Sequence, residues 1–153
     1  MGRINMARMI LGGIVAGIVA NILGYLVDGL LLANQWNAGM RALGKGELSV
    51  SQIVGLNIVG LAYGIFLVWL YAAIRPRYGP GPKTAVFAGL MAWAIGTLLP
   101  NVALMGLQGL FPQSLTIATT AGAIVESLAG ALAGAALYKE EGGDTTQSIA
   151  ARA

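Results

Sequence analysis

The segment from Met9 to Leu32 reads MILGGIVAGIVANILGYLVDGLLL, and it decides the fold. A helix needs about 20 predominantly apolar residues to cross the hydrocarbon core of a membrane, so this segment is long enough. Only Asn21 and Asp28 interrupt its apolar character. Two arginines precede it, as in a signal peptide, but no small-x-small cleavage motif follows a short apolar core. We therefore expect a retained membrane-spanning helix.

Three further segments have the same apolar character and a similar length. They run from about residue 50 to 74, from 84 to 107 and from 115 to 138. We predict an all-α, polytopic membrane protein whose four transmembrane helices, 9–32 included, form a glycine-rich bundle. Residues 1–139 would form this single domain, and residues 140–153 a polar cytoplasmic tail.

The composition excludes several classes of function. Only 10% of the 153 residues are charged, 57% are hydrophobic and the mean hydropathy is +0.75. A soluble domain carries about 25% charged residues, which is more than twice this share. The chain has no Cys and no His, which removes the usual zinc, haem and copper ligands and any Ser-His or Cys-His nucleophile. We expect a non-catalytic protein with no metal site and no cofactor.

The positive charges predict the orientation in the membrane. Seven lie on one side of the predicted helices: Arg3, Arg8, Arg75, Arg77, Lys83, Lys139 and Arg152. Two, Arg41 and Lys45, lie on the other side. The more positive side is normally cytoplasmic, so we expect both termini inside the cell. This topology explains the net charge of +3 without a nucleic-acid partner. Arg75, Arg77 and Lys83 are also candidates to bind anionic lipid headgroups, although orientation alone accounts for them.

Glycine makes up 23 of the 153 residues, about twice the usual share of ~7%. In lipid, small residues let helix backbones approach closely, so we expect each helix to pack through one small or polar face. The predicted packing glycines are Gly13, Gly17, Gly24, Gly60, Gly64, Gly122, Gly130 and Gly134. These faces would meet within one chain, between copies, or against other membrane subunits, while the larger apolar faces would meet the lipid bilayer.

Glu126 is the most unusual residue, because it lies about midway along the fourth predicted helix. A carboxyl group at that depth is costly and is a candidate for a proton- or cation-handling site. The alternative is a protonated side chain that joins helices, worth about 0.6 kcal/mol. We predict Asn21 or Tyr63 as its hydrogen-bond partner. A direct pair with Asp28 is disfavoured, because the helical rise separates the two by about 10 Å in depth.

Asp28 lies closer to the outer end of the first helix, where Asn57, Asn101 and Gln52 are nearest to it in depth. We expect it to make a cap or loop contact. The first loop, around Trp36, is either a short interfacial helix or a plain loop.

Two prolines mark the other helix boundaries. Pro76 should end the second helix soon after residue 74. Pro100 should kink the third helix. Two other structures are possible around Pro100. The third helix ends there, before a partly re-entrant segment, 102–110, or it is a broken helix at a substrate site.

The stretch from Trp69 to Ala85 reads WLYAAIRPRYGPGPKTA. It resembles a stretch found in small, uncharacterised four-helix membrane proteins of bacteria, and Gly109-Leu-Phe-Pro112 adds to the resemblance. The resemblance covers about a sixth of the chain. It implies a bacterial inner-membrane location and carries over no activity.

The sequence leaves three functions open. The first is an accessory, structural or assembly subunit of a larger membrane complex, favoured by the glycine-lined faces and the lack of catalytic groups. The second is a small homo-oligomeric transporter or channel in which Glu126 handles protons or cations. The third is a membrane enzyme acting on lipid or quinone, with Glu126 or Asp28 as its acid or base.

Overall fold

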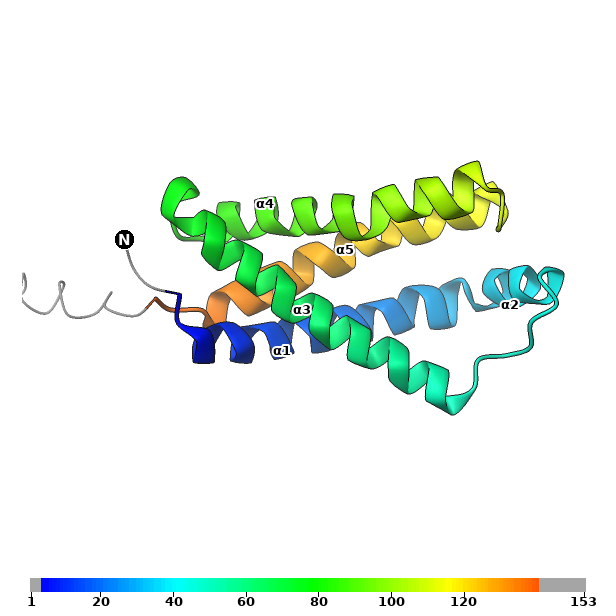
Figure 1. Cartoon of the computed structure of the whole chain (residues 1–153), viewed down its shortest axis with the longest axis horizontal. Helices are drawn as coiled ribbons and strands as arrows, with labels where there is room; N and C mark the ends of the chain where they lie inside the picture. The colour runs from blue at the N-terminus through cyan, green and yellow to red at the C-terminus, as the bar shows by residue number, and fades with distance from the viewer. Residues whose placement is uncertain (1–3, 141–153) are drawn as a thin grey trace, which may run out of the picture.

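The computed structural model describes residues 4–140 and is a bundle of helices (Figure 1). Four helices are long and apolar enough to cross a membrane: Met6–Leu31, Val50–Tyr78, Pro82–Leu107 and Gln113–Leu137. This described part contains no strand. The prediction of an all-α chain with four helices of membrane-spanning length is therefore confirmed. Arg3, Arg152 and the predicted tail beyond residue 140 lie outside the described residues.

Two of the four long helices change from α- to π-helical geometry along their length. The first consists of α1 (Met6–Gly24) and η1 (Tyr25–Leu31). The third begins as α4 (Pro82–Trp93) and continues through η2 (Ala94–Leu98) and η3 (Asn101–Leu107). Pi-helical turns are rare, and they occur frequently at functional sites. All three π-helical segments lie in the half of the bundle away from the chain termini (Figure 1).

The other two long helices are α-helical throughout. They are α3 (Val50–Tyr78) and α5 (Gln113–Leu137). Helix α3 begins at a capping box, in which the Ser49 hydroxyl accepts from the Gln52 backbone N–H at 3.4 Å. The first loop contains α2 (Ala33–Ala42), so the helical alternative for this loop is the one present.

The second long helix continues beyond its predicted end at residue 74. It passes through Pro76 and ends at Tyr78. Pro76 has no N–H to donate within the helix, but only one turn remains after Ile74, so few further hydrogen bonds are affected. Gly79 ends the helix with φ 82°, and its N–H donates to the Arg75 carbonyl at 2.8 Å. The glycine, and not the proline, is the stop signal.

Helix α1 makes the two most extensive helix contacts of the bundle, one with α3 and one with α5. On its α3 side, a Cβ atom placed on Gly17 would lie 2.7 Å from the Leu61 Cα atom. On its α5 side, one placed on Gly12 would lie 2.6 Å from the Gly134 carbonyl oxygen. Both contacts are between backbones, which only glycine permits at these distances.

The predicted packing glycines therefore divide into two groups, where the sequence predicted one face on each helix. Gly13, Gly17, Gly60 and Gly64 lie between α1 and α3. Gly24, Gly122, Gly130 and Gly134 lie between the first long helix and α5. Helix α1 thus presents two small faces. The missed contact glycines include Gly12, and Gly89, which faces the Ser127 carbonyl of α5.

The two ends of the bundle are packed differently. The end that carries both described termini, here called the terminal end, holds the larger buried cluster: Met9, Ala16, Val68, Tyr71, Ala72, Ala85, Ala88 and Tyr138. Towards the opposite end, here called the α2 end, α3 and α4 diverge (Figure 1). From residue 51 to 59 every residue of α3 except Gly55 is exposed, and Gly55 is only partly covered. The α2 end is consequently open on the side between α3 and α4.

Candidate functional site

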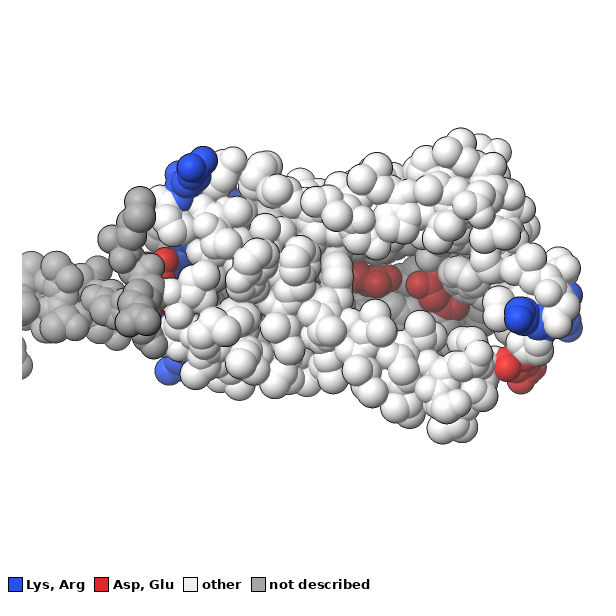
Figure 2. All heavy atoms as spheres, viewed as in Figure 1, with Lys and Arg blue, Asp and Glu red and all other residues white. Residues whose placement is uncertain are grey.

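A hollow between α3 and α4 reaches acidic groups inside the bundle. Figure 2 shows acidic atoms at two places within this hollow, away from both ends of the molecule. Of the acidic residues in the described part, Asp28 and Glu126 are those that belong to the long helices. The hollow therefore opens sideways onto Asp28 and Glu126, at a depth that lipid would surround.

Glu126 lies on α5 against the first long helix. A Cβ atom placed on Gly24 would lie 3.3 Å from its Oε2 atom, so the absence of a side chain there makes room for the carboxyl group. Its Oε1 atom is buried and has no hydrogen-bond partner within residues 4–140. A buried carboxyl oxygen without a donor is costly in a protein interior and more so in lipid.

The predicted partners of Glu126 are engaged elsewhere, so that prediction is wrong. The Asn21 Nδ2 atom donates to the Asn57 carbonyl at 3.0 Å, which joins α1 to α3. The Tyr63 hydroxyl lies 2.6 Å from the Ser127 hydroxyl, which joins α3 to α5. The helical rise gives the depth of each group and predicts that these groups lie at one level. It gives no information about the direction in which each side chain points around its helix axis.

Ser127 is a site residue that the sequence analysis missed. Its side chain is only 2% exposed, and the Tyr63 hydroxyl is its partner. The available signal was its position next to Glu126 in the middle of a long apolar helix, where hydroxyl groups commonly bond across helices.

Asp28 joins three elements at the α2 end. Its Oδ1 atom accepts from the Trp36 indole N–H at 3.0 Å and from the Thr119 hydroxyl at 2.8 Å. Asp28 lies on η1, Trp36 on α2 and Thr119 on α5. The expected contact of Asp28 with the first loop is therefore present, and it is made to helix α2, which lies in that loop. Asn57 and Asn101, the closest groups in predicted depth, do not bond to it; the Asn101 amide donates to the Thr120 hydroxyl at 2.8 Å.

Pro100 lies between η2 and η3, and the helix continues past it to Leu107. A proline ring in a helix crowds the carbonyl four residues before it, here that of Gly96. The wider π-helical turns on both sides of Pro100 accommodate this ring. The same irregular segment begins η3 at Asn101, whose amide faces α5.

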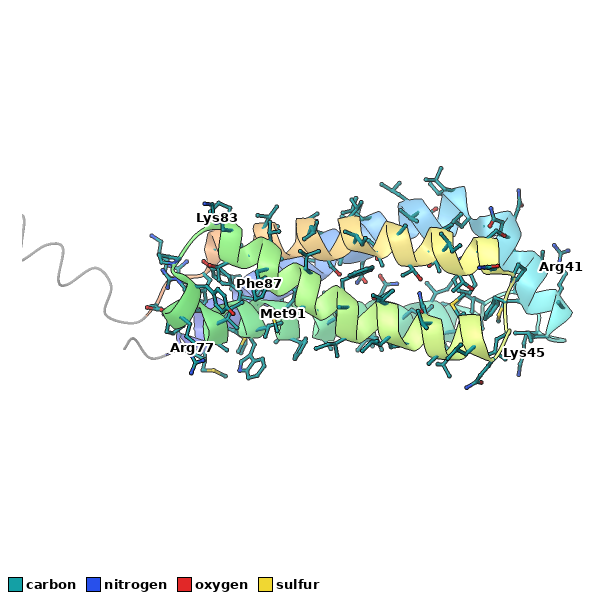
Figure 3. The ribbon with its side chains drawn as sticks, turned by 90° about the horizontal axis from the view of Figure 1, so that it is seen from above. Arg41, Lys45, Arg77, Lys83, Phe87 and Met91 are labelled. Carbon is teal, nitrogen blue, oxygen red and sulfur yellow. The ribbon has the colours of Figure 1, made fainter. Side chains whose placement is uncertain are left out.

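The basic groups lie at the two ends of the bundle. Figure 3 shows Arg77 and Lys83 at the terminal end, and Arg41 and Lys45 at the α2 end. Arg75 is engaged within the chain, because its Nη1 atom lies 3.1 Å from the Glu140 Oε1 atom. Its guanidinium also lies 5.6 Å from the centre of the Tyr138 ring. Arg77 and Lys83 are exposed.

The described residues contain no group of three or more His, Cys, Asp or Glu side chains that could hold a metal ion. What it does offer is a carboxyl group that can accept or release a proton, or pair with a cation, at the wall of a laterally open hollow. Comparisons with protein-family models, with curated proteins and with solved structures find no match to this chain.

Proposed function

We propose that this chain is a non-catalytic accessory, structural or assembly subunit of a larger complex in the bacterial inner membrane. The observation that supports this proposal is the open hollow beside Glu126, whose buried Oε1 atom has no hydrogen-bond partner within residues 4–140. An intramembrane carboxyl group normally faces a bundle interior or pairs with another group. A neighbouring subunit seated over the hollow would supply that environment.

The uneven coverage of the four spans supports the same proposal. In the most apolar 18 residues of each span, 28% are buried in the first and 22% in the fourth, but only 17% in the second and 11% in the third. The second and third spans are α3 and α4, the two walls of the hollow. The least covered side of the bundle is therefore also the side with the exposed polar interior.

We propose further that both termini are cytoplasmic and that the third span bends at Pro100. Arg77 and Lys83, with Arg75 beside them, would then meet anionic lipid headgroups of the inner leaflet. Single cysteines test this orientation cleanly, because the chain has no cysteine of its own. A membrane-impermeant thiol reagent added to intact cells should label Lys45→Cys and leave Lys83→Cys unlabelled; the reverse pattern would invert the topology.

The decisive experiment is mass analysis of the intact assembly after gentle extraction from native membranes. We expect the chain to be recovered with larger subunits at a fixed stoichiometry. Recovery as a monomer, or as a small oligomer of this chain alone, would contradict the proposal.

The alternative is a small homo-oligomeric transporter or channel, and the position of Glu126 in an open hollow favours it over catalysis. Its test is proton-linked flux in liposomes that contain the purified chain. Glu126→Gln keeps the shape of the side chain and removes its titration. Flux that is present and unaffected by this substitution would exclude Glu126 as the coupling residue, and the absence of any flux would exclude transport by this chain alone.

A further inference from the structure

We infer that the hollow between α3 and α4 seats one transmembrane helix of a partner protein, and that this helix carries a Lys or Arg that pairs with Glu126. The inference rests on the proposed function, and it names the chemistry of the partner.

The first argument is that Glu126 has no hydrogen-bond donor, although several donors lie at a similar depth. The donors nearest to it in depth are already committed, Asn21 to the Asn57 carbonyl and Trp93 to the Thr120 carbonyl. Tyr63 is paired with Ser127. The Glu126 Oε1 atom is left with no donor in the described chain. Within residues 4–140, no side chain therefore bonds to or neutralises the Glu126 carboxyl group.

The second argument is charge complementarity. The hollow opens onto two carboxyl groups, those of Asp28 and Glu126, whereas every Lys and Arg of the sequence lies at or beyond the ends of the long helices. A second copy of this chain would bring a further carboxyl group to mid-membrane depth and no cation. The complementary occupant is a different polypeptide with a basic side chain inside its span, since charged groups within membranes pair with one another.

The third argument is the shape of the uncovered surface. The exposed stretch of α3 from residue 51 to 59 is about 13 Å long at the helical rise, nearly half of a hydrocarbon core of about 30 Å. No atom lies within 4 Å of a Cβ atom placed on Gly55, in the middle of this stretch. A glycine with no neighbour in an exposed stretch of a membrane helix leaves room for the close approach of another helix backbone. A strip of this length fits a helix better than a small cationic molecule.

The test uses the full chain in its native membrane, with a photo-reactive amino acid at position 55. The matched control carries the same residue at position 18, because Ile18 is 46% exposed and belongs to α1 and not to either of the helices α3 and α4 that form the walls of the hollow. We expect position 55, and not position 18, to cross-link to one transmembrane segment that contains a Lys or Arg. Cross-linking only to lipid, to another copy, or to a segment without a basic residue would overturn the inference.

A charge exchange makes the assignment specific. Glu126→Lys should lower the position-55 cross-link at least about tenfold, equivalent to about 1.4 kcal/mol of binding free energy. Replacing the partner's basic residue with Glu should restore the cross-link in the Glu126→Lys background. Glu126→Gln, which is isosteric, should also weaken the cross-link, so the test survives if Glu126→Lys fails to fold.

The outcomes separate this inference from the proposed function. If the larger assembly keeps its stoichiometry with Glu126→Lys and the cross-link is undiminished, the subunit proposal stands and the pairing is wrong. If the unmodified chain forms no larger assembly, both fail.

Discussion

Gly17→Ala tests whether the close approach of α1 and α3 holds the bundle together. The added Cβ atom would lie 2.7 Å from the Leu61 Cα atom and 2.9 Å from the Gly60 carbonyl oxygen. Ordinary contact begins at 3.4 Å, so the two helices must separate by about 0.7 Å. Backbone atoms cannot rotate away as a side chain can, and a gap of 0.5–1 Å forfeits roughly a quarter to a half of each dispersion contact.

We expect Gly17→Ala to lower the free energy of unfolding by about 1–3 kcal/mol, the usual cost of overpacking. Helix propensity does not offset this loss, because the separated helices remain helical in a membrane-like solvent. The matched control is Gly55→Ala, whose Cβ atom meets nothing within 4 Å. It should change the free energy by no more than about 0.5 kcal/mol.

The assay is equilibrium unfolding in mixed micelles with increasing SDS, followed by tryptophan fluorescence. Both variants and the unmodified chain are compared under identical micelle conditions. If Gly17→Ala is as stable as Gly55→Ala, the backbone contact between α1 and α3 is not tight, and the division of the packing glycines into two groups loses its main support.

Three further predictions concern the polar contacts. Asp28→Ala removes the acceptor of the Trp36 indole N–H and should lower the free energy of unfolding by about 1–3 kcal/mol. Asp28→Asn keeps an acceptor oxygen and should lower it clearly less. Equal losses for the two variants would contradict the contact. Tyr63→Phe leaves Ser127 without its partner and should cost about 0.6 kcal/mol in the same assay, and a gain in stability would exclude the bond. Burial raises the pKa of the Tyr138 phenol above its ordinary value of 10.0. The contribution of the neutral phenol to the free energy of unfolding should therefore be complete below pH 10 and be lost as the pH rises through the higher pKa. Tyr138→Phe should remove this pH dependence. Unfolding measurements between pH 9 and about 12 would detect it.

The long helices could be predicted from the sequence because the need to bury about 20 apolar residues in lipid leaves a strong signal. The signal is weaker at helix ends, where local geometry decides. Pro76 was predicted to end the second helix, but a proline in the last turn of a helix removes few hydrogen bonds, so the helix continues past it. Helix α3 ends where Gly79 takes a positive φ. In the sequence this glycine stands together with three other turn-forming residues, so it could not be singled out.

The contacts of the polar groups could be predicted only in part. Rise per residue gives depth, and depth placed Asn21, Tyr63 and Glu126 at one level. It does not fix which neighbour each side chain faces, so the Asn21 amide meets α3 while the Glu126 carboxyl group meets Gly24. The π-helical geometry of η1 adds to the difficulty, because it rotates Asp28 away from the direction that a regular helix would give it.

The extensive contact of α1 with α3 has a consequence for how the protein is made. Of the described helices, α1 is synthesised before the others, and the helix with which it shares the most contacts, α3, is the next long one. A nascent chain extended to about Tyr78 can therefore complete its most extensive helix pair before α4 exists. The hairpin of α4 and α5 then packs against this pair, with α5 on the other small face of α1 and α4 against α3. Biogenesis in this order needs no rearrangement of the first hairpin, and two fragments divided in the loop at Gly79–Gly81 should reassemble when they are expressed together.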